Sequence, residues 1–197
     1  NRWGDFWSAS LAWDICKEDW FNVSWVNMLK VKASYGEQGN DQIGDFLYTT
    51  RYELVNSDGT PGAVPYSLGN KDITWETQGN FNVGVDFAFF GNRFGGTLDY
   101  YYRLTTNLLY NYSVPVPPYD YKTMFTNVGS ICNQGIELTL YGTPVQKDNF
   151  EWNTTLTLAN NTNKLVSFTN EEFKSGDYKV GYISTPIGQY TQRLIEG

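Results

Sequence analysis

The sequence contains no histidine, and only 18% of its 197 residues are charged, against about 25% in an ordinary soluble domain. Without imidazole, catalytic sites of the Ser-His-Asp and Cys-His types are excluded within these residues, and so are histidine-based metal sites. The two cysteines, Cys16 and Cys132, indicate neither a disulfide framework nor a metal site. We therefore expect no catalytic residues, no cofactor and no bound metal ion.

Long apolar runs are also missing. No stretch approaches the roughly 18 consecutive apolar residues that mark a membrane-spanning helix. The net charge of −7 and the absence of a basic face argue against nucleic acid as a partner. The chain starts at Asn1, without an initiator methionine, and stops at Gly197 after a segment typical of a loop. We interpret it as an internal fragment of a longer protein.

Aromatic side chains, by contrast, are abundant at 17% of the residues. Many lie in segments that alternate with a period of two, which places successive side chains on opposite faces of a β-strand. From Thr74 to Phe89 the odd positions are mainly apolar or aromatic and the even positions mainly polar. The pattern resumes from Phe94 to Asn111, after a tight turn at Gly91-Asn92, and Leu109 is its exception.

These patterns predict an all-β fold, an antiparallel meander of about six strands within one partial domain that covers residues 1–197. The expected strands are 3–15, 29–36, 74–89, 94–111, 127–141 and 150–161. The expected long outer loops are 37–73, 112–126 and 163–197. A helical turn is possible in the connection from Cys16 to Met28.

Long strands with short turns on one side and long loops on the other indicate part of a large transmembrane β-barrel. Aromatic residues near the expected strand ends, such as Trp13 and Trp152 at the short-turn side and Trp75 at the other, fit two interfacial girdles. A soluble β-sandwich that binds carbohydrate also alternates and remains the alternative on pattern alone.

Charged residues on the polar face are interpreted as structural. Asp99 and Arg103 share that face and are expected to form an ion pair, which Asp86 could join from across the hairpin. Glu76 and Asp86 also share it, but their spacing puts the backbones about 33 Å apart. That separation excludes a glycosidase-type pair of carboxylates within this strand.

Tyrosines of the long loops are the candidate ligand-binding residues, because aromatic rings offer flat apolar faces to sugars or to a partner protein. They are Tyr48, Tyr52 and Tyr66 in the first long loop and Tyr112, Tyr119 and Tyr121 in the second. The alternative is that the loops use them to pack on one another. Asp41, Asp45 and Glu53 carry oxygen ligands of the kind Ca²⁺ prefers, but they show no EF-hand spacing.

Four motifs, in order, resemble the SusC/RagA-like TonB-linked outer-membrane proteins. They are NRWGDFWSASLAWDICKEDWF (1–21), LKVKASYGEQGN (29–40), ITWETQGNFNVGVDFAFFGNRFGGTLDYYYRLTTNLL (73–109) and NVGSICNQGIELTL (127–140). Each motif is weak alone, and the ordered set, over about residues 1–166, is specific.

This resemblance implies a barrel of about 22 strands with a plugged lumen. It further implies import of glycans or peptides across the outer membrane of Bacteroidetes-type bacteria. The expected partners are a SusD-like surface lipoprotein, TonB acting through a plug region, an oligosaccharide or peptide substrate, and outer-membrane lipid. A ferric-siderophore receptor of the same transport class and a secreted soluble carbohydrate-binding domain are the alternatives.

Overall fold

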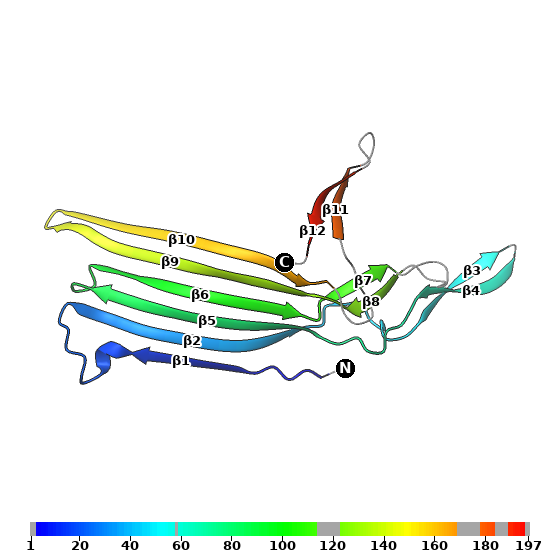
Figure 1. The fold of residues 1–197 in the computed structure, drawn as a ribbon, viewed down its shortest axis with the longest axis horizontal. Helices are drawn as coiled ribbons and strands as arrows, with labels where there is room; N and C mark the ends of the chain where they lie inside the picture. The colour runs from blue at the N-terminus through cyan, green and yellow to red at the C-terminus, as the bar shows by residue number, and fades with distance from the viewer. Residues whose placement is uncertain (1–2, 58, 114–122, 169–177, 184–188, 196–197) are drawn as a thin grey trace.

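The structure is a computed structural model that describes residues 3–57, 59–113, 123–168, 178–183 and 189–195. Its largest element is an open six-stranded sheet in which all neighbouring strands are antiparallel (Figure 1). In spatial and chain order its strands are β1 (Ser8–Asp14), β2 (Val26–Asn40), β5 (Glu76–Phe89), β6 (Phe94–Thr106), β9 (Ser130–Lys147) and β10 (Phe150–Ser167). The predicted all-β antiparallel meander is confirmed. Among the described strands, β1 and β10 form the two open edges.

Several strands differ from the expected ranges at their ends. β1 begins at Ser8 rather than at residue 3, although the Glu37 amide still donates to the Trp7 carbonyl at 2.9 Å. β2, β9 and β10 run beyond the expected 29–36, 127–141 and 150–161. Backbone pairing with a neighbour prolongs a strand past the point where its side-chain alternation fades, because pairing does not depend on side-chain polarity.

The expected strand 94–111 is corrected to two strands. β6 ends at Thr106, and β7 (Leu109–Ser113) begins after a break. At the break, Asn107 has a φ of 55°, a left-handed conformation that Asn adopts more readily than most residues. The chain leaves the sheet here, which explains why the alternation fails at Leu109.

Two-stranded hairpins occupy parts of the segments expected as long loops. They are β3 (Arg51–Ser57) with β4 (Thr60–Ser67), β7 with β8 (Thr123–Asn127), and β11 (Tyr178–Ile183) with β12 (Gln189–Leu194). The first two project beyond the end of the sheet that is opposite its short turns (Figure 1). Asp58-Gly59 was a sequence signal for the first, since this dipeptide is typical of tight hairpin turns, and Gly59 has a φ of 81°.

The short-turn end is held by backbone geometry and one asparagine. In the β5–β6 turn, Phe90, Gly91 and Asn92 have φ angles of 57°, 69° and 66°. The Asn27 side-chain oxygen accepts a hydrogen bond from the Gly91 amide at 2.6 Å, which connects this turn to the start of β2. The β1–β2 connection contains a short 3₁₀ helix, η1 (Ile15–Lys17). Within the described residues, no helix has both the length and the apolar character that crossing a membrane requires.

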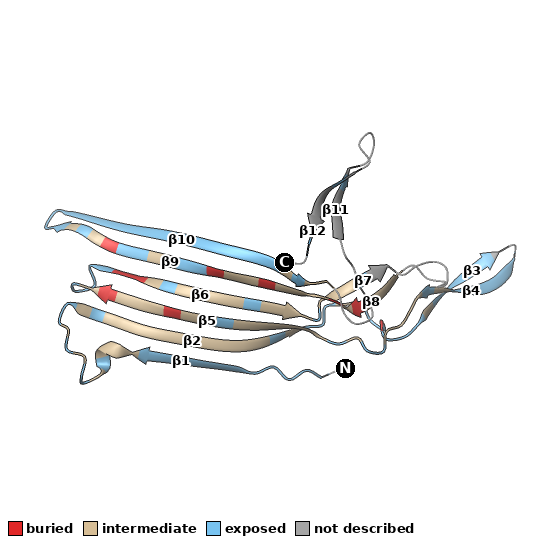
Figure 2. Ribbon diagram, in the orientation of Figure 1, coloured by how far each residue is buried: buried red, intermediate tan, exposed pale blue. Residues whose placement is uncertain are grey.

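The sheet is a single layer and has almost no core of its own (Figure 2). Its few buried apolar side chains include Ala88 and Cys132, while β10 is exposed along nearly its whole length. A sheet with one apolar face requires a second surface to cover that face. Among the described strands, none forms a second layer on the apolar face of this sheet.

Candidate functional site

Two adjacent rows of paired residues show how the sheet separates side chains by polarity. One row is entirely apolar: Trp13, Val31, Val85, Leu98, Leu138 and Leu158. The next row carries charge: Ala12, Lys32, Gly84, Asp99, Glu137 and Ala159. Directly opposed residues share a face, and successive residues of a strand take opposite faces. The sheet therefore has an apolar face, which carries the first row, and a polar face, which carries the second.

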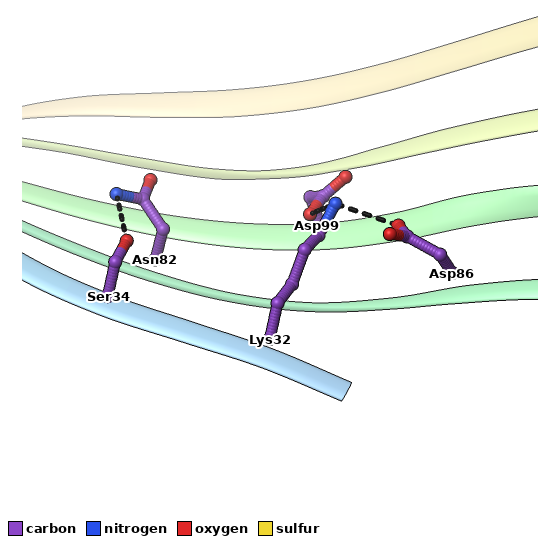
Figure 3. A network of polar contacts seen from close by, with 5 residues as sticks. All are labelled: Lys32, Ser34, Asn82, Asp86 and Asp99. Atoms are coloured by element: carbon purple, nitrogen blue, oxygen red, sulfur yellow. Dashed lines mark hydrogen bonds and ion pairs between the residues drawn. The ribbon is translucent and has the colours of Figure 1, made fainter. Parts of the chain in front are cut away.

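Lys32 is the centre of an ion cluster on the polar face (Figure 3). Its Nζ lies 2.8 Å from Asp86 Oδ1 on β5 and 3.0 Å from Asp99 Oδ1 on β6. The Lys32, Asp86 and Asp99 side chains remain 38%, 20% and 33% exposed, so water screens their attraction. Each pair is expected to stabilise the fold by up to about 1 kcal/mol, as for other exposed ion pairs.

Gly84 makes this cluster possible. It lies between Lys32 on β2 and Asp99 on β6 in the register of the sheet, and it offers no side chain. A Cβ at this position would collide with Asp99 Oδ1 and would lie 2.7 Å from Lys32 Cε. The long lysine side chain therefore crosses a whole strand to reach its partner.

The predicted ion pair between Asp99 and Arg103 is wrong. Asp99 pairs with Lys32, and the Arg103 guanidinium lies over the Tyr101 ring, 5.1 Å from its centroid. The physical reason is distance, because four residues along a strand separate two backbones by about 13 Å. The suggestion that Asp86 belongs to the Asp99 network is confirmed, with Lys32 as the link.

A few side chains are buried where the β3–β4 and β7–β8 hairpins, here called the outer hairpins, join the sheet. Leu47 lies between β2 and β3, Thr126 on β8, and Val128 between β8 and β9. Asn127 connects two of these segments: its side-chain oxygen accepts a hydrogen bond from the Thr74 amide at 2.8 Å, and its Nδ2 donates to the carbonyls of Thr74 and Asn107, both at 2.9 Å. The segment before β5 is thus held to the β7–β8 hairpin. Sequence patterns did not identify this role, because a single Asn carries no periodic signal.

Two of the candidate tyrosines lie on the β3–β4 hairpin. Tyr52 is on β3 and Tyr66 on β4, and each is 63% exposed. The Arg51 guanidinium lies 5.7 Å from the Tyr66 ring centroid, a cation–π contact that orients this ring. The hairpin therefore presents two aromatic rings to the surroundings at the outer end of the sheet.

Tyr48 precedes that hairpin and lines a separate open hollow of about 530 Å³. Asp41 and Asp45 line the same hollow, whereas Glu53 lies on β3 outside it. In the described ranges, no group of three or more His, Cys, Asp or Glu side chains is placed to hold a metal ion. The structure thus brings two of the three weak Ca²⁺ candidates together, without a ligand set.

The remaining candidates are in the second long loop. Tyr112 belongs to β7, where its backbone pairs with Met124 of β8. Tyr119 and Tyr121 lie outside the described residues. Ligand binding by the six tyrosines therefore stays a prediction.

Exposed aromatic residues gather at the short-turn end of the sheet. Trp13, Trp20, Trp25 and Phe90 are 47%, 65%, 51% and 58% exposed. Trp25 stacks on Phe90 with ring centroids 5.7 Å apart, and Trp13 lies 6.3 Å from Trp20. Such amphipathic rings suit the boundary between lipid and water. Trp20 and Trp25 were not singled out from the sequence, because they lie in the β1–β2 connection rather than in an alternating strand.

Comparison with known proteins gives a consistent match. Residues 1–188 match the family model described as TonB dependent receptor-like, beta-barrel. The chain is 34% identical over 212 residues to TonB-dependent receptor P39 of Formosa agariphila, covering 98% of this chain and 20% of that protein. It is 30% identical to TonB-dependent receptor SusC of Bacteroides thetaiotaomicron, covering 98% of this chain and 22% of SusC.

The fold also matches solved structures. A chain of the RagAB peptide importer in its open-open state superposes with a TM-score of 0.79 at 26% sequence identity, covering 98% of this chain and 20% of that one. The closed-closed state gives a TM-score of 0.76 at 27% identity, covering 89% of this chain and 19% of the other. The chain thus spans about a fifth of the length of these relatives. They are named as receptors and as an importer, not as enzymes.

Proposed function

Because this chain belongs to the TonB-dependent receptor-like β-barrel family, we propose that it is part of the wall of an outer-membrane importer of glycans or peptides. The observation that carries the proposal is the pair of adjacent rows, one wholly apolar and one charged, on opposite faces of a single-layer sheet. A barrel wall needs this division, since one face meets lipid and the other meets the lumen.

In this proposal the apolar face and the aromatic residues of the short-turn end contact outer-membrane lipid. The polar face, including the Lys32 cluster, borders the path of the solute. The short-turn end lies toward the periplasm and the β3–β4 and β7–β8 hairpins lie outside the cell, because barrels of this class have short periplasmic turns and longer outer loops. TonB supplies energy through a plug region elsewhere in the whole protein.

We further propose that the outer hairpins meet the ligand and a SusD-like surface lipoprotein. Tyr52 and Tyr66 support this role, since each is 63% exposed on a hairpin that projects beyond the sheet. The same proposal for Tyr48 is supported by its 45% exposure and its position in the lining of an open hollow. Tyr112, Tyr119 and Tyr121 belong to the second outer segment and are proposed as further contacts.

Both substrate classes have support. SusC of Bacteroides thetaiotaomicron and the RagAB peptide importer are similar to this chain at 30% and 26% identity. RagAB is a peptide importer, which favours peptides. The carboxamide and hydroxyl side chains on the polar face of this chain suit sugars equally well. The family match argues against a secreted soluble carbohydrate-binding domain.

An uptake experiment with the whole protein tests the proposal. Cells that lack the gene and cells complemented with it are supplied with fluorescent oligosaccharides, fluorescent oligopeptides or a ferric siderophore, with and without a protonophore. We expect energy-dependent uptake of an oligosaccharide or a peptide only in complemented cells. Uptake restricted to the siderophore would favour the alternative receptor class, and equal uptake with and without the gene would contradict import altogether.

A further inference from the structure

The polar face contains an open hollow of about 680 Å³ between β1, β2, β5 and the end of β6. It exists because Gly36 of β2 is paired with Ser8 on one side and with Asn80 on the other, which leaves a gap in that row of side chains. A Cβ on Gly36 would lie only 3.2 Å from Ser8 Cβ. The size is in the range of small-molecule sites, about 300–1,000 Å³.

The lining is rich in groups that both donate and accept hydrogen bonds. Four carboxamide side chains, Gln38, Gln78, Asn80 and Asn82, line the hollow together with serine hydroxyls. Asn82 Nδ2 donates weakly to Ser34 Oγ at 3.4 Å, and this pair is visible in Figure 3. Carboxamides and hydroxyls match the hydroxyl groups of a sugar, which also donate and accept.

Arg103 is the only cation among the residues that line the hollow. It is exposed, and it has no carboxylate partner in the described part of the chain. Its guanidinium rests on the Tyr101 ring, 5.1 Å from the centroid, and Asn80 lies directly opposite it on β5. An arginine supported on an aromatic face keeps its fork of donors in a defined plane, ready for a carboxylate.

Two nearby carboxylates are engaged with other partners. Asp99, the nearest acid on the strand of Arg103, pairs with Lys32 at 3.0 Å. Glu37, the one acid that lines the hollow, shares the face of Tyr35 and accepts a hydrogen bond from its hydroxyl at 3.0 Å. The protein therefore leaves one positive charge unneutralised among uncharged hydrogen-bonding groups.

We propose that this hollow binds an acidic sugar unit of an oligosaccharide. Arg103 pairs with the uronate carboxylate, and the carboxamides of Asn80, Asn82 and Gln78 bind the adjacent hydroxyls. A peptide is less well matched, because the hollow offers few apolar side chains to receive those of a peptide. This inference rests on the proposed function and gives it a substrate class.

The position of the hollow agrees with an early contact on the import path. Arg103 lies near the end of β6 and Gln78 near the start of β5, both at the end of the sheet that carries the outer hairpins. A solute that enters between the hairpins meets this surface before it reaches the Lys32 cluster, which lies nearer the short turns.

Equilibrium binding to the full-length protein in detergent, measured by calorimetry, tests the proposal. The probes are trigalacturonate, maltotriose and the tripeptide Glu-Glu-Glu. We expect trigalacturonate to bind most tightly, and Arg103→Gln to weaken its binding about tenfold or more, the equivalent of about 1.4 kcal/mol. Arg103→Lys keeps the charge and should restore part of the affinity, whereas Lys147→Gln removes a charge at the far β9–β10 turn and should change nothing.

A second variant, Asn80→Ala, tests the same site with a substitution that should not disturb folding. It removes a carboxamide that makes no hydrogen bond among those described. We expect it to weaken trigalacturonate binding about two- to tenfold with an unchanged unfolding temperature. Unchanged trigalacturonate affinity in Arg103→Gln would overturn the inference, as would tighter binding of the tripeptide. If Arg103→Gln lowers the unfolding temperature and the unaltered protein does not bind trigalacturonate, another segment of the protein fills the hollow. That result would also overturn the inference. Retained uptake of other glycans or peptides by cells would leave the proposed function standing in each case.

Discussion

Lys32 Nζ and Asp99 Oδ1 lie 3.0 Å apart, although β5 separates their strands in the sheet. The contact passes over Gly84, whose missing side chain leaves the space, and Asp86 of the same strand completes the cluster at 2.8 Å. The absence of a side chain at Gly84 thus allows charged groups on two non-adjacent strands to form an ion pair on the polar face.

Substituting Gly84 tests this relationship directly. Gly84→Ala places a Cβ against Asp99 Oδ1 and 2.7 Å from Lys32 Cε, so both side chains have to move. We expect the free energy of unfolding of the full-length protein to fall by about 1–3 kcal/mol, as for other overpacked positions. Urea unfolding in lipid vesicles measures it. Gly44→Ala is the matched control, because a Cβ there meets nothing within 4 Å; an equal effect of both changes would contradict the prediction.

Removing the lysine should expose the repulsion that it offsets. Lys32→Gln leaves Asp86 and Asp99 without their shared cation, and we expect the unfolding free energy to fall by up to about 2 kcal/mol, about 1 for each exposed ion pair. Adding Asp99→Asn should recover part of the loss, which a double-mutant cycle measures. Strict additivity of the two changes would show that the contact contributes nothing. Raising the ionic strength should shrink the coupling, since salt screens partly exposed charges.

A lysine substitution should destabilise the protein much more on the apolar face of β10 than on its polar face. Leu158 belongs to the apolar row and Thr157 to the polar face, next to it on the strand. We expect Leu158→Lys to cost about 2–4 kcal/mol if this row lies near the bilayer midplane, and Thr157→Lys to cost little. Urea unfolding of the full-length protein in vesicles compares them. Equal costs would refute the assignment of lipid to the apolar face.

Loss of the Asn127 side chain should loosen the outer hairpins while leaving the sheet intact. Asn127→Ala removes the contacts to Thr74 and Asn107 and leaves backbone groups unpaired. We expect the Val128 amide, bonded to the Leu108 carbonyl at 2.8 Å, to exchange its hydrogen about five to a hundred times faster. Asn56→Ala, at an exposed position of β3, is the control and should leave that rate unchanged. Unaltered exchange in Asn127→Ala would rule out this role.

Replacing the outer tyrosines should weaken binding of the imported solute without changing the free energy of unfolding. Tyr52→Ala and Tyr66→Ala remove rings that are each 63% exposed, so the unfolding free energy should barely change. Affinity for the solute identified by uptake should fall by roughly 0.5–1.5 kcal/mol for each ring that stacks on it. Calorimetry on the full-length protein provides the measurement. Tyr182→Ala, on the separate β11–β12 hairpin, is the control; if it matches the two test variants, the β3–β4 hairpin has no special role.

Much of the sheet was predictable, because its information is local. Alternation from Thr74 to Phe89 reports the polarity of the two faces directly, and Gly91-Asn92 reports the turn that follows. The β7–β8 hairpin was missed for the opposite reason. The hairpin starts after Asn107, whose left-handed backbone conformation turns the chain out of the sheet. This turn hardly changes the alternation of apolar and polar residues, so the sequence pattern did not reveal it.

The register, and everything that depends on it, was not predictable. Alternation placed Lys32, Asp86 and Asp99 on one face, but it does not state which residue of one strand lies opposite which residue of the next. The expected pair of Asp99 with Arg103 was a guess within one strand, where about 13 Å separates the backbones. The true partner lies two strands away, across Gly84.

The sequence by itself determined that this protein is an antiparallel meander with one apolar and one polar face, because side-chain direction in a strand follows from position along the chain. Its ordered motifs also determined the family. Only the tertiary structure decided which charges meet over Gly84, how Asn127 holds the outer hairpins, and that Gly36 opens a hollow beside Arg103. Those features arise from contacts between residues far apart in the chain, and no local pattern encodes such contacts.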